Sequence, residues 1–378
     1  MALNRPVAVI GSATRLPIAG DQYSLEEVLY QVSQAALADA GLTIADVDGI
    51  VVGSNDQVDG RAISVMMASG SVGGVDRDIL STPSAGEHAF VMGMLRVASA
   101  QFETQLVVAW GVTESNSLSE VERLANDPYF HRRLPQDDLS TYALQANQLL
   151  AATPTARDLA ARLTEANLKR GAQAYPQVAA PVQTAAAIAA SEAVRWPLRA
   201  GMCSTPVAGA VAIVLGSADL VKKKGITKAA YIRGAGWATD AAFMGDRDLT
   251  ATPALDAALG QALRDAGAKD LAGVEVAEVS GPTPYQELLA YRGLGLGDAP
   301  QWPALIDGTA GPKINPSGGM MALNAVFCGG LARIAEAAAQ VRGVAGAHQV
   351  AGCQRAVAHA ASGPAMMYQA VVLLDRNP

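Results

Sequence analysis

Two stretches of the chain share one pattern of apolar and polar positions. Apolar residues recur at i, i+3, i+4 and i+7 over residues 24–41 and again over 254–267, and both stretches end at a glycine. The matched cores read ALADAG at 36–41 and ALRDAG at 262–267. Each stretch follows a strand-like run and precedes an Asp-containing turn or short loop and a Val-rich run. The pattern predicts a β-α-β unit used twice, and therefore a duplicated α/β fold with mostly buried sheets.

The pattern of apolar and polar residues changes over residues 115–202. The segments LSTYALQANQLLAAT and TARDLAARLTEANLKRGAQAY carry helical periodicity, and strand signals are almost absent. We predict a helical insertion over about 115–202, within an N-terminal half of residues 1–225 that precedes a C-terminal half of residues 226–378. Long insertions of this kind often cover an active site or bind a ligand.

Composition narrows the class of protein. The chain has 378 residues, of which 50% are hydrophobic and 17% are charged, which is typical of a well-buried globular protein. The net charge of −7 offers no basic face for nucleic acid, so nucleic-acid binding is not expected. No apolar run reaches the ~18 residues that indicate a membrane span.

The numbers of cysteine and histidine residues further limit the class of protein and its cellular compartment. The three cysteines form no C-x-x-C pair, which favours a reducing compartment and a cytoplasmic location. The N-terminus runs directly into a strand-like segment, so we expect no signal peptide. With only four histidines, we expect neither a metal site nor a tightly bound cofactor.

The duplicated pattern and several segments resemble the thiolase superfamily, and most of all its sterol-carrier-protein-x type branch. The segments are residues 7–53, 141–177 and 196–221 and the sequence NPSGG at 315–319, and the resemblance covers nearly the whole chain. It implies a layered α-β-α-β-α fold with a helical loop domain and an acyl-CoA substrate, so that coenzyme A enters as part of the substrate. It also implies a homodimer, with a small OB-fold/zinc-ribbon protein or a second thiolase-like chain as a possible further partner.

Thiolases of this superfamily carry a nucleophilic cysteine on a strand-to-helix turn, because a thiolate attacks an acyl thioester readily. Alignment on Gly86 and Ala89 places that position at Pro83, and a shift of one residue places it at Ser84. Neither residue supplies a thiolate. We interpret Ser84 as a helix N-cap or as a nucleophile that needs a base, and we interpret His88 as a packing or capping residue. Backbone amides around Gly86 could still polarise a thioester oxygen.

The other catalytic motifs of the family are also altered. The histidine of the G-H-P motif aligns with Asn324, or with Ala325 if NPSGG sets the register. The amide of Asn324 could donate to a thioester oxygen but could not shuttle a proton. Where the branch has H-D-C-F, this chain has SGPT at 280–283 or, with a gap, the residues near Glu278, and the histidine is absent in either alignment. Tyr285 lies just beyond as a candidate acid/base or a packing residue. His359 and the backbone of Gly363 are the candidates in the last turn.

Two hypotheses follow from these losses. One is an enzyme that cleaves or forms a carbon–carbon bond on a CoA thioester without a cysteine nucleophile, as retro-aldolases do, or an atypical acyltransferase. It would use Ser84, Tyr285, Asn324, His359 and the amides of Gly86 and Gly363. The other is a non-catalytic thiolase-like subunit of a hetero-oligomer. A standard cysteine thiolase is the least favoured of the possibilities.

Overall fold

A single ten-stranded sheet runs through the molecule, with both halves of the chain contributing strands. The computed structural model describes residues 5–16, 23–60, 62–83, 85–111, 117–178 and 180–378. The N-terminal strands are β1 (Val7–Arg15), β2 (Gly49–Ser54), β3 (Asp78–Pro83), β4 (Thr104–Gly111) and β8 (Gly209–Ser217). The C-terminal strands are β9 (Ala230–Thr239), β10 (Val276–Val279), β11 (Lys313–Ile314), β13 (Arg355–Ser362) and β14 (Tyr368–Asp375).

The two halves repeat one topology. From the centre outward, the first half runs β1-β8-β4-β2-β3 and the second runs β9-β14-β13-β10-β11. In each half the first two pairings are antiparallel and the last two are parallel. Only Ala8–Tyr231 and Val9–Ala230 pair across the centre, between β1 and β9. The duplicated α/β fold predicted from the sequence is confirmed, whereas the division at residue 225 stays a prediction.

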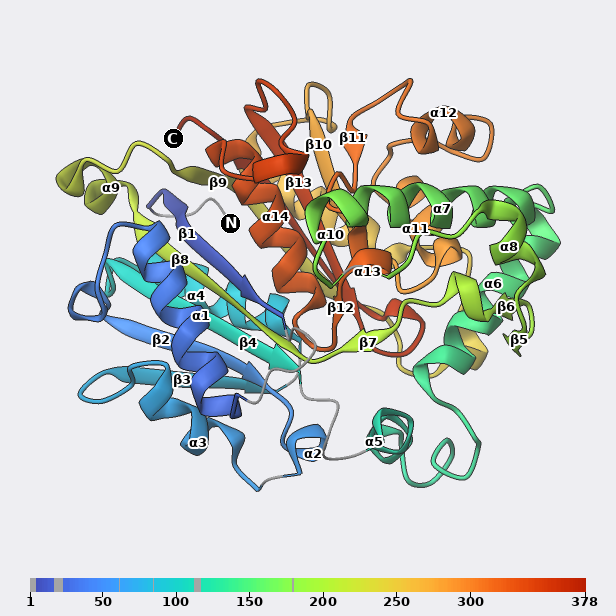
Figure 1. The fold of residues 1–378 in the computed structure, drawn as a ribbon, viewed down its shortest axis with the longest axis horizontal. Helices are drawn as coiled ribbons and strands as arrows, with labels where there is room; N and C mark the ends of the chain where they lie inside the picture. The colour runs from blue at the N-terminus through green and yellow to red at the C-terminus, as the bar shows by residue number, and fades with distance from the viewer. Residues whose placement is uncertain (1–4, 17–22, 61, 84, 112–116, 179) are drawn as a thin grey trace.

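The helices complete a layered α-β-α-β-α arrangement (Figure 1). The central helices α4 (Gly86–Ala98) and α14 (Gly329–Arg342) contact each other; α4 packs on β2, β4 and β8, and α14 packs on β10 and β13. On the outer faces, α1 (Leu25–Asp39) covers β1 and β8, and α10 (Pro253–Ala266) covers β9 and β14. These outer helices are the two repeated stretches of the sequence pattern.

Small residues allow each outer helix to approach its sheet closely. A Cβ at Gly11 of β1 would lie 2.3 Å from the carbonyl oxygen of Ala36 in α1. A Cβ at Gly234 of β9 would lie 2.0 Å from the carbonyl oxygen of Ala262 in α10. Any larger side chain would force strand and helix apart. The two halves therefore repeat this close contact as well as their topology.

The insertion of the first half packs on the second half. Its helices are α5 (Leu118–Ala125), α6 (Asp138–Ala152), α7 (Ala156–Ala174) and α8 (Ala185–Ala190), followed by the short strands β5 (Ala193–Arg195), β6 (Leu198–Arg199) and β7 (Pro206–Val207). Helix α6 contacts α11 (Pro284–Gly293), and α7 contacts α11, α12 (Trp302–Ile306) and α13 (Gly319–Ala322). Their buried apolar side chains form a second core with those of the C-terminal strands.

The remaining elements are short. They are α2 (Asp56–Asp59), α3 (Ser64–Ser71), α9 (Ala218–Lys224) and β12 (Asn324–Ala325), which pairs in parallel with β7. Within the described ranges, every helix is too short or too polar to cross a bilayer.

Candidate functional site

Three segments that are distant in sequence meet at the N-terminus of α4. They are residues 85–88, 324–327 and 362–368, and we call their meeting point the α4 junction. The amide of Gly86 donates to the carbonyl oxygen of Phe327 at 2.5 Å. The hydroxyl of Ser362 donates to the carboxylate of Glu87 at 2.7 Å. These two hydrogen bonds tie the start of α4 to both segments of the C-terminal half.

An imidazole and a phenol lie side by side at this junction. The ring of His88 stands edge-on to the ring of Tyr368, with centroids 5.3 Å apart and planes at 88°. Both side chains are half-buried, so they are neither sealed in the core nor free in solvent. The pair places two groups capable of proton transfer beside the helix terminus.

The turn that leads into α4 is strained at Ala85. Ala85 occupies the N-cap position with φ 48° and ψ 110°, and no side chain caps the helix there. A positive φ is unusual for any residue with a Cβ. Ala85 holds the N-cap position of α4, and both interpretations of Ser84 stay predictions. Ser84 itself lies outside the described residues.

The backbone amides at the junction are not equally available. The Gly86 amide is already bonded to Phe327, so it is not free to polarise a substrate as the sequence led us to expect. The amides of Ala85 and Gly363 donate to no acceptor among the described residues. Because a helix N-terminus also favours negative charge, these two amides are better candidates for an oxyanion.

Asn324 lies at the same junction. Its side-chain amide donates to the hydroxyl of Ser204 at 2.9 Å, and its strand β12 pairs with β7. The amide of Ser204 in turn donates to the carbonyl oxygen of Pro282, within the SGPT sequence that replaces H-D-C-F. Asn324 is half-buried, whereas Ala325, the other candidate for the G-H-P position, is fully buried. The second segment of the junction therefore begins with a side-chain amide that has a second hydrogen to donate.

Tyr285 is not brought to the junction. It begins α11 with only 1% of its surface exposed and belongs to the core shared with the insertion. Burial raises the pKa of its hydroxyl, and the charges of Arg157 and Arg199 partly oppose this rise. Among the described residues, no hydrogen bond or ring contact joins it to Asn324, Gly86 or Gly363. Its geometry matches the packing alternative that the sequence left open.

His359 lies behind the third segment of the junction and contacts none of Ala85, Gly86 and Asn324 through a hydrogen bond among the described residues. It is fully buried on β13, and its Nε2 lies 2.7 Å from Oε1 of Gln369. Burial lowers its pKa to about 4, so the imidazole is neutral near pH 7. It lines a small cavity with Gln145, Arg247 and Gln286, behind the last turn rather than at the α4 junction.

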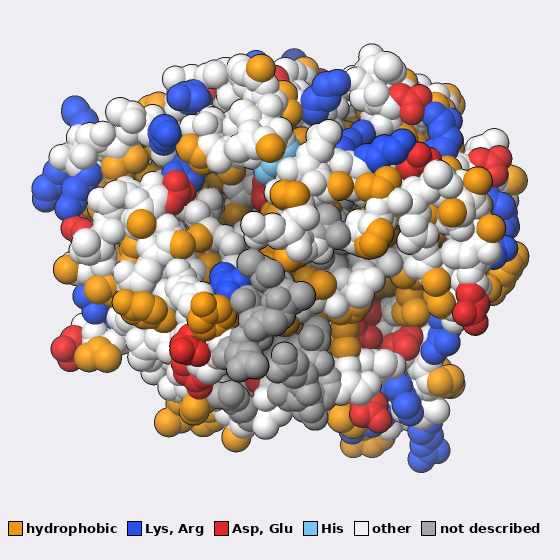
Figure 2. Space-filling model, viewed as in Figure 1, with side chains coloured by type: hydrophobic (Ala, Val, Ile, Leu, Met, Phe, Trp, Pro, Cys, Tyr) orange, Lys and Arg blue, Asp and Glu red, His pale blue; other side chains and the backbone are white. Residues whose placement is uncertain are grey.

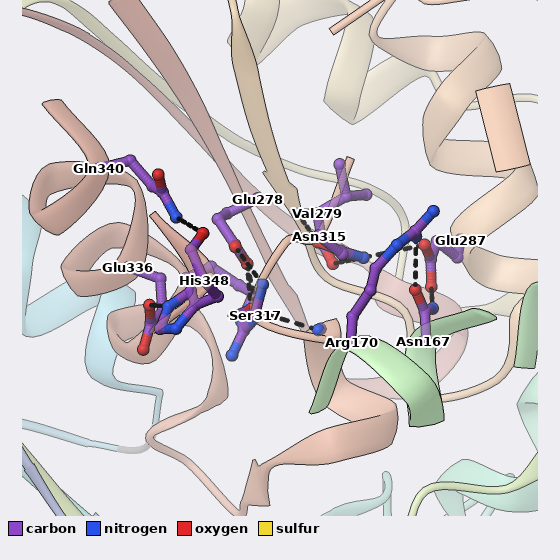
Figure 3. Close-up of polar contacts among 12 residues, drawn as sticks. Asn167, Arg170, Glu278, Val279, Glu287, Asn315, Ser317, Glu336, Gln340 and His348 are labelled. Carbon is purple, nitrogen blue, oxygen red and sulfur yellow. Dashed lines mark hydrogen bonds and ion pairs between the residues drawn. The ribbon is translucent and has the colours of Figure 1, made fainter. Parts of the chain in front are cut away.

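The NPSGG sequence is anchored by buried carboxylates (Figure 3). Ser317 donates through its hydroxyl to Glu278 at 2.7 Å, and Arg333 pairs with the same carboxylate at 2.5 Å. Asn315 donates to Glu287 at 2.8 Å, and burial raises the pKa of Glu287 to about 7. The network fixes the segment that leads to Asn324. The two glutamates were missed at the sequence level, although a charged residue within an apolar strand or helix signals such a partner.

None of the three cysteines is poised as a nucleophile. Burial raises the pKa of Cys203 and of Cys353 to about 11, and it raises that of Cys328 further. A thiol with a raised pKa carries little thiolate at neutral pH. Cys328 and Cys353 are buried and Cys203 is partly buried.

Glu87, Ala85 and Tyr368 were also missed as site residues. Nothing in their local sequence marks them, because their role comes from contacts between segments far apart in the chain. In the part of the chain that the structure describes, no cluster of three or more His, Cys, Asp or Glu side chains is arranged to hold a metal ion.

The repeated five-stranded halves, the paired central helices and the junction at α4 define a thiolase-like fold. Residues 236–376 match the family described as "Thiolase C-terminal domain-like". An acetyl-CoA acetyltransferase of Methanothermobacter thermautotrophicus is 26% identical over 374 residues, covering 94% of this chain and 96% of that protein. The family match thus covers the C-terminal part of the chain, and the similarity to this relative extends over nearly its whole length.

Solved structures agree on the fold. The Ltp2-ChsH2(DUF35) aldolase has a TM-score of 0.82 at 18% identity, covering 100% of this chain and 99% of that one. A monomeric SCP2-thiolase like protein from Mycobacterium smegmatis has a TM-score of 0.75 at 19% identity, covering 100% and 78%. Human mitochondrial 3-ketoacyl-CoA thiolase has a TM-score of 0.73 at 19% identity, with both chains covered in full.

Proposed function

We propose that this protein binds a CoA thioester and cleaves or forms a carbon–carbon bond on it without a covalent cysteine intermediate. The observation that carries the proposal is the α4 junction. It combines the strained Ala85 at the start of α4, two amides without an acceptor among the described residues, and the His88–Tyr368 pair. Such a site offers proton transfer and oxyanion stabilisation, and it offers no thiolate.

Retro-aldol cleavage of a 3-hydroxyacyl thioester needs only these groups. A base removes the hydroxyl proton, the bond between C2 and C3 breaks, and C3 leaves as an aldehyde or ketone. The electron pair passes to the thioester enolate, and an acid then protonates C2. In this proposal His88 and Tyr368 move the protons. The amides of Ala85 and Gly363, with the side chain of Asn324, stabilise the enolate oxygen.

The insertion offers a surface for the nucleotide part of CoA. Arg157 stacks over the ring of Trp196 at 5.3 Å, and Arg199 lies on the adjacent strand. Arginines bind phosphates and a tryptophan can stack on a base. The chain then runs from Arg199 to Ser204, which bonds Asn324 at the junction. We therefore place the acyl end of the substrate at the junction and the nucleotide end at the insertion.

A turnover assay tests the proposal. Purified protein is incubated with a panel of 3-hydroxyacyl-CoA and 3-ketoacyl-CoA thioesters, with and without candidate partner proteins, and products are identified by mass spectrometry. We expect a shorter acyl-CoA and a carbonyl product from at least one 3-hydroxyacyl-CoA, with the rate lost in His88→Gln. Calorimetry with CoA is run in parallel. Absence of both turnover and CoA affinity would overturn the proposal.

A second function is favoured by one comparison. The Ltp2-ChsH2(DUF35) aldolase carries two protein names, so that neighbour works with another subunit. This chain could likewise be a non-catalytic subunit beside an active thiolase-like chain or an OB-fold/zinc-ribbon protein. Affinity purification from the native source separates the two functions. Recovery of a lone homodimer that turns over acyl-CoA would reject the accessory role.

We further propose a homodimer that assembles along the edge of the sheet. Strand β3 ends the sheet order and its outer edge is unpaired among the described residues. Nearby exposed apolar side chains are Ile63, Met66, Met67 and Val75. Figure 2 shows apolar side chains at the lower left, where Figure 1 places α3. Light scattering gives the mass directly, and a monomer at micromolar concentration would reject the dimer.

We also propose a cytoplasmic location for the protein, which cell fractionation tests.

A further inference from the structure

The turn between β13 and β14 has an unusual backbone. Ala365 has φ 48° and ψ 39°, and Met366 has φ 50°, although neither residue is glycine. Two left-handed residues with side chains persist in succession only where the surrounding structure holds them. The same turn begins with Gly363, whose amide faces no acceptor among the described residues.

Side chains from two other segments hold this turn. The amide of Ala365 donates to the hydroxyl of Thr141 at 2.7 Å. Its carbonyl oxygen accepts from Gln145 at 3.3 Å and from Arg247 at 3.1 Å. Thr141 and Gln145 lie on α6 of the insertion, and Arg247 follows β9. Both hydrogen-bonding groups of one strained residue are therefore satisfied by side chains from outside the turn.

The anchoring side chains are themselves fixed. Arg247 pairs with Asp240 at 3.0 Å, and Gln145 accepts from Gln286 at 3.1 Å. Thr141 is fully buried and Gln145 is 5% exposed, so water does not compete for these hydrogen bonds.

A small cavity lies behind the turn. It is lined by Ala365 and Met366 together with Gln145, Arg247 and His359. Atoms that border a void lack contacts on one side. The hydrogen bonds to Ala365 therefore support the turn on a side where packing is incomplete.

We infer that Thr141 and Gln145 of the insertion, together with Arg247, are positioning residues that hold the Gly363 amide beside the start of α4. The role of the Gly363 amide as an oxyanion donor rests on the proposed function. That the three side chains hold the turn does not depend on it. Helix α6 thereby links the insertion, which we propose to bind the nucleotide, to the oxyanion donor at the junction.

Thr141→Val removes the hydroxyl and keeps a β-branched side chain of similar shape. Thr164→Val is the matched control, because Thr164 is equally buried in the insertion but its hydroxyl bonds only Ala160 within its own helix, at 2.9 Å. Hydrogen exchange of the peptide covering residues 363–367 is measured by mass spectrometry in both variants. The same proteins are assayed for kcat and KM on the best acyl-CoA of the panel.

Both variants lose a hydrogen bond within a helix, from Thr141 to the Asp138 carbonyl or from Thr164 to the Ala160 carbonyl, but only Thr141→Val also loses the bond to the turn. We therefore expect exchange of this peptide to be about tenfold faster in Thr141→Val and unchanged in Thr164→Val. We also expect kcat to fall about tenfold with KM unchanged, as for an interaction made in the transition state. Equal exchange in both variants would overturn the inference. If Thr141→Val fails to fold, Arg247→Lys, which retains the charge opposite Asp240, replaces it.

Failure of the proposed function is distinguishable from failure of this inference. A wild-type protein without turnover or CoA binding rejects the proposed function, while the exchange comparison alone still decides whether α6 holds the turn. A tenfold difference in exchange with unchanged kcat would overturn the assignment of Gly363 as the donor.

Discussion

The two central helices are entered by very different connections. Strand β3 ends at Pro83 and α4 begins at Gly86, so residues 84–85 alone separate them. In the other half, β11 ends at Ile314 and α14 begins at Gly329, and residues 315–328 lie between them. Both connections occupy the same place in a duplicated topology. The first is short and strained at Ala85, and the second is long and anchored on buried charges.

The two connections differ in how firmly they are anchored and in which groups they bring to the α4 junction. The long connection is held by Glu278, Arg333 and Glu287, and its Phe327 carbonyl receives the first amide of α4. The short connection contains the strained Ala85 and leads directly to the half-buried His88 of α4. The long connection is therefore the more strongly anchored of the two, and the short one brings His88 to the junction, which Asn324, Gly363 and Tyr368 of the C-terminal half complete. The predictions below test this division of roles.

The largest expected effect comes from breaking the anchor of the long connection. Arg333 and Glu278 are both fully buried and pair at 2.5 Å. Arg333→Met leaves a buried carboxylate without its partner, so the free energy of unfolding should fall by about 3–5 kcal/mol. Denaturant titration measures the change. Arg292→Met, at the more exposed Arg292–Asp298 pair, should cost less than about 1 kcal/mol. Similar losses in both variants would refute the anchor.

The second effect concerns Glu287, the other buried carboxyl group that anchors the long connection, and the pH dependence of stability. Burial raises the pKa of Glu287 to about 7 from its ordinary 4.5. The folded state thus holds this proton more tightly, so its contribution to stability is complete below pH ~4.5 and is lost as the pH rises through 7. The loss amounts to about 3 kcal/mol. Glu287→Gln should flatten the profile of unfolding free energy against pH by that amount.

The measured quantity is the slope of unfolding free energy against pH. The absolute free energy is not used, because an amide at position 287 also changes the hydrogen bonds that Asn167 and Asn315 donate to Glu287. Exposed Glu120 provides the control, and Glu120→Gln should keep the wild-type slope. If Glu287→Gln keeps the wild-type slope as well, Glu287 is charged in the folded protein and the pKa assignment is wrong.

A third, smaller effect lies where the two halves meet. Ser362→Ala removes the donor to the Glu87 carboxylate, which is 2% exposed. A hydrogen bond to a buried charge contributes about 2 kcal/mol, so unfolding should become easier by that amount. Ser99→Ala removes a bond from an exposed hydroxyl to a neutral carbonyl and should cost at most about 1 kcal/mol. Equal effects would mean that the Ser362–Glu87 contact does not stabilise the junction.

The fold could be predicted because the spacing of apolar residues along each segment indicates its helices and strands. The repeats at 24–41 and 254–267 form α1 and α10, each of which covers the strands of its own half of the sheet. The site could be predicted only in part. Asn324 and Gly363 lie at the junction, but Tyr285 and His359 turned inward. One-dimensional alignment cannot say which face of an element meets another element.

The strain at the start of α4 was also beyond sequence reasoning. Alignment on Gly86 and Ala89 places the nucleophile position at Pro83 or Ser84, which stays a prediction, and the strained residue at the helix start is Ala85. Backbone strain has no compositional signal when the residue is alanine. The pairing of Glu87 with Ser362 likewise joins positions far apart in the chain.

The last prediction tests the register of the nucleophile turn directly. If Ala85 stands where a thiolase nucleophile would, Ala85→Cys places a thiol at the N-terminus of α4, where the helix dipole and free amides favour the thiolate. Alkylation by iodoacetamide should be about tenfold faster, about 1.4 kcal/mol in activation free energy, than in Met92→Cys, which exposes a thiol within the same helix. Incubation with acyl-CoA should add an acyl mass to Ala85→Cys alone. If Pro83→Cys reacts faster than Ala85→Cys, the register drawn from the sequence is right and the strained turn is not the vestige of a nucleophile site.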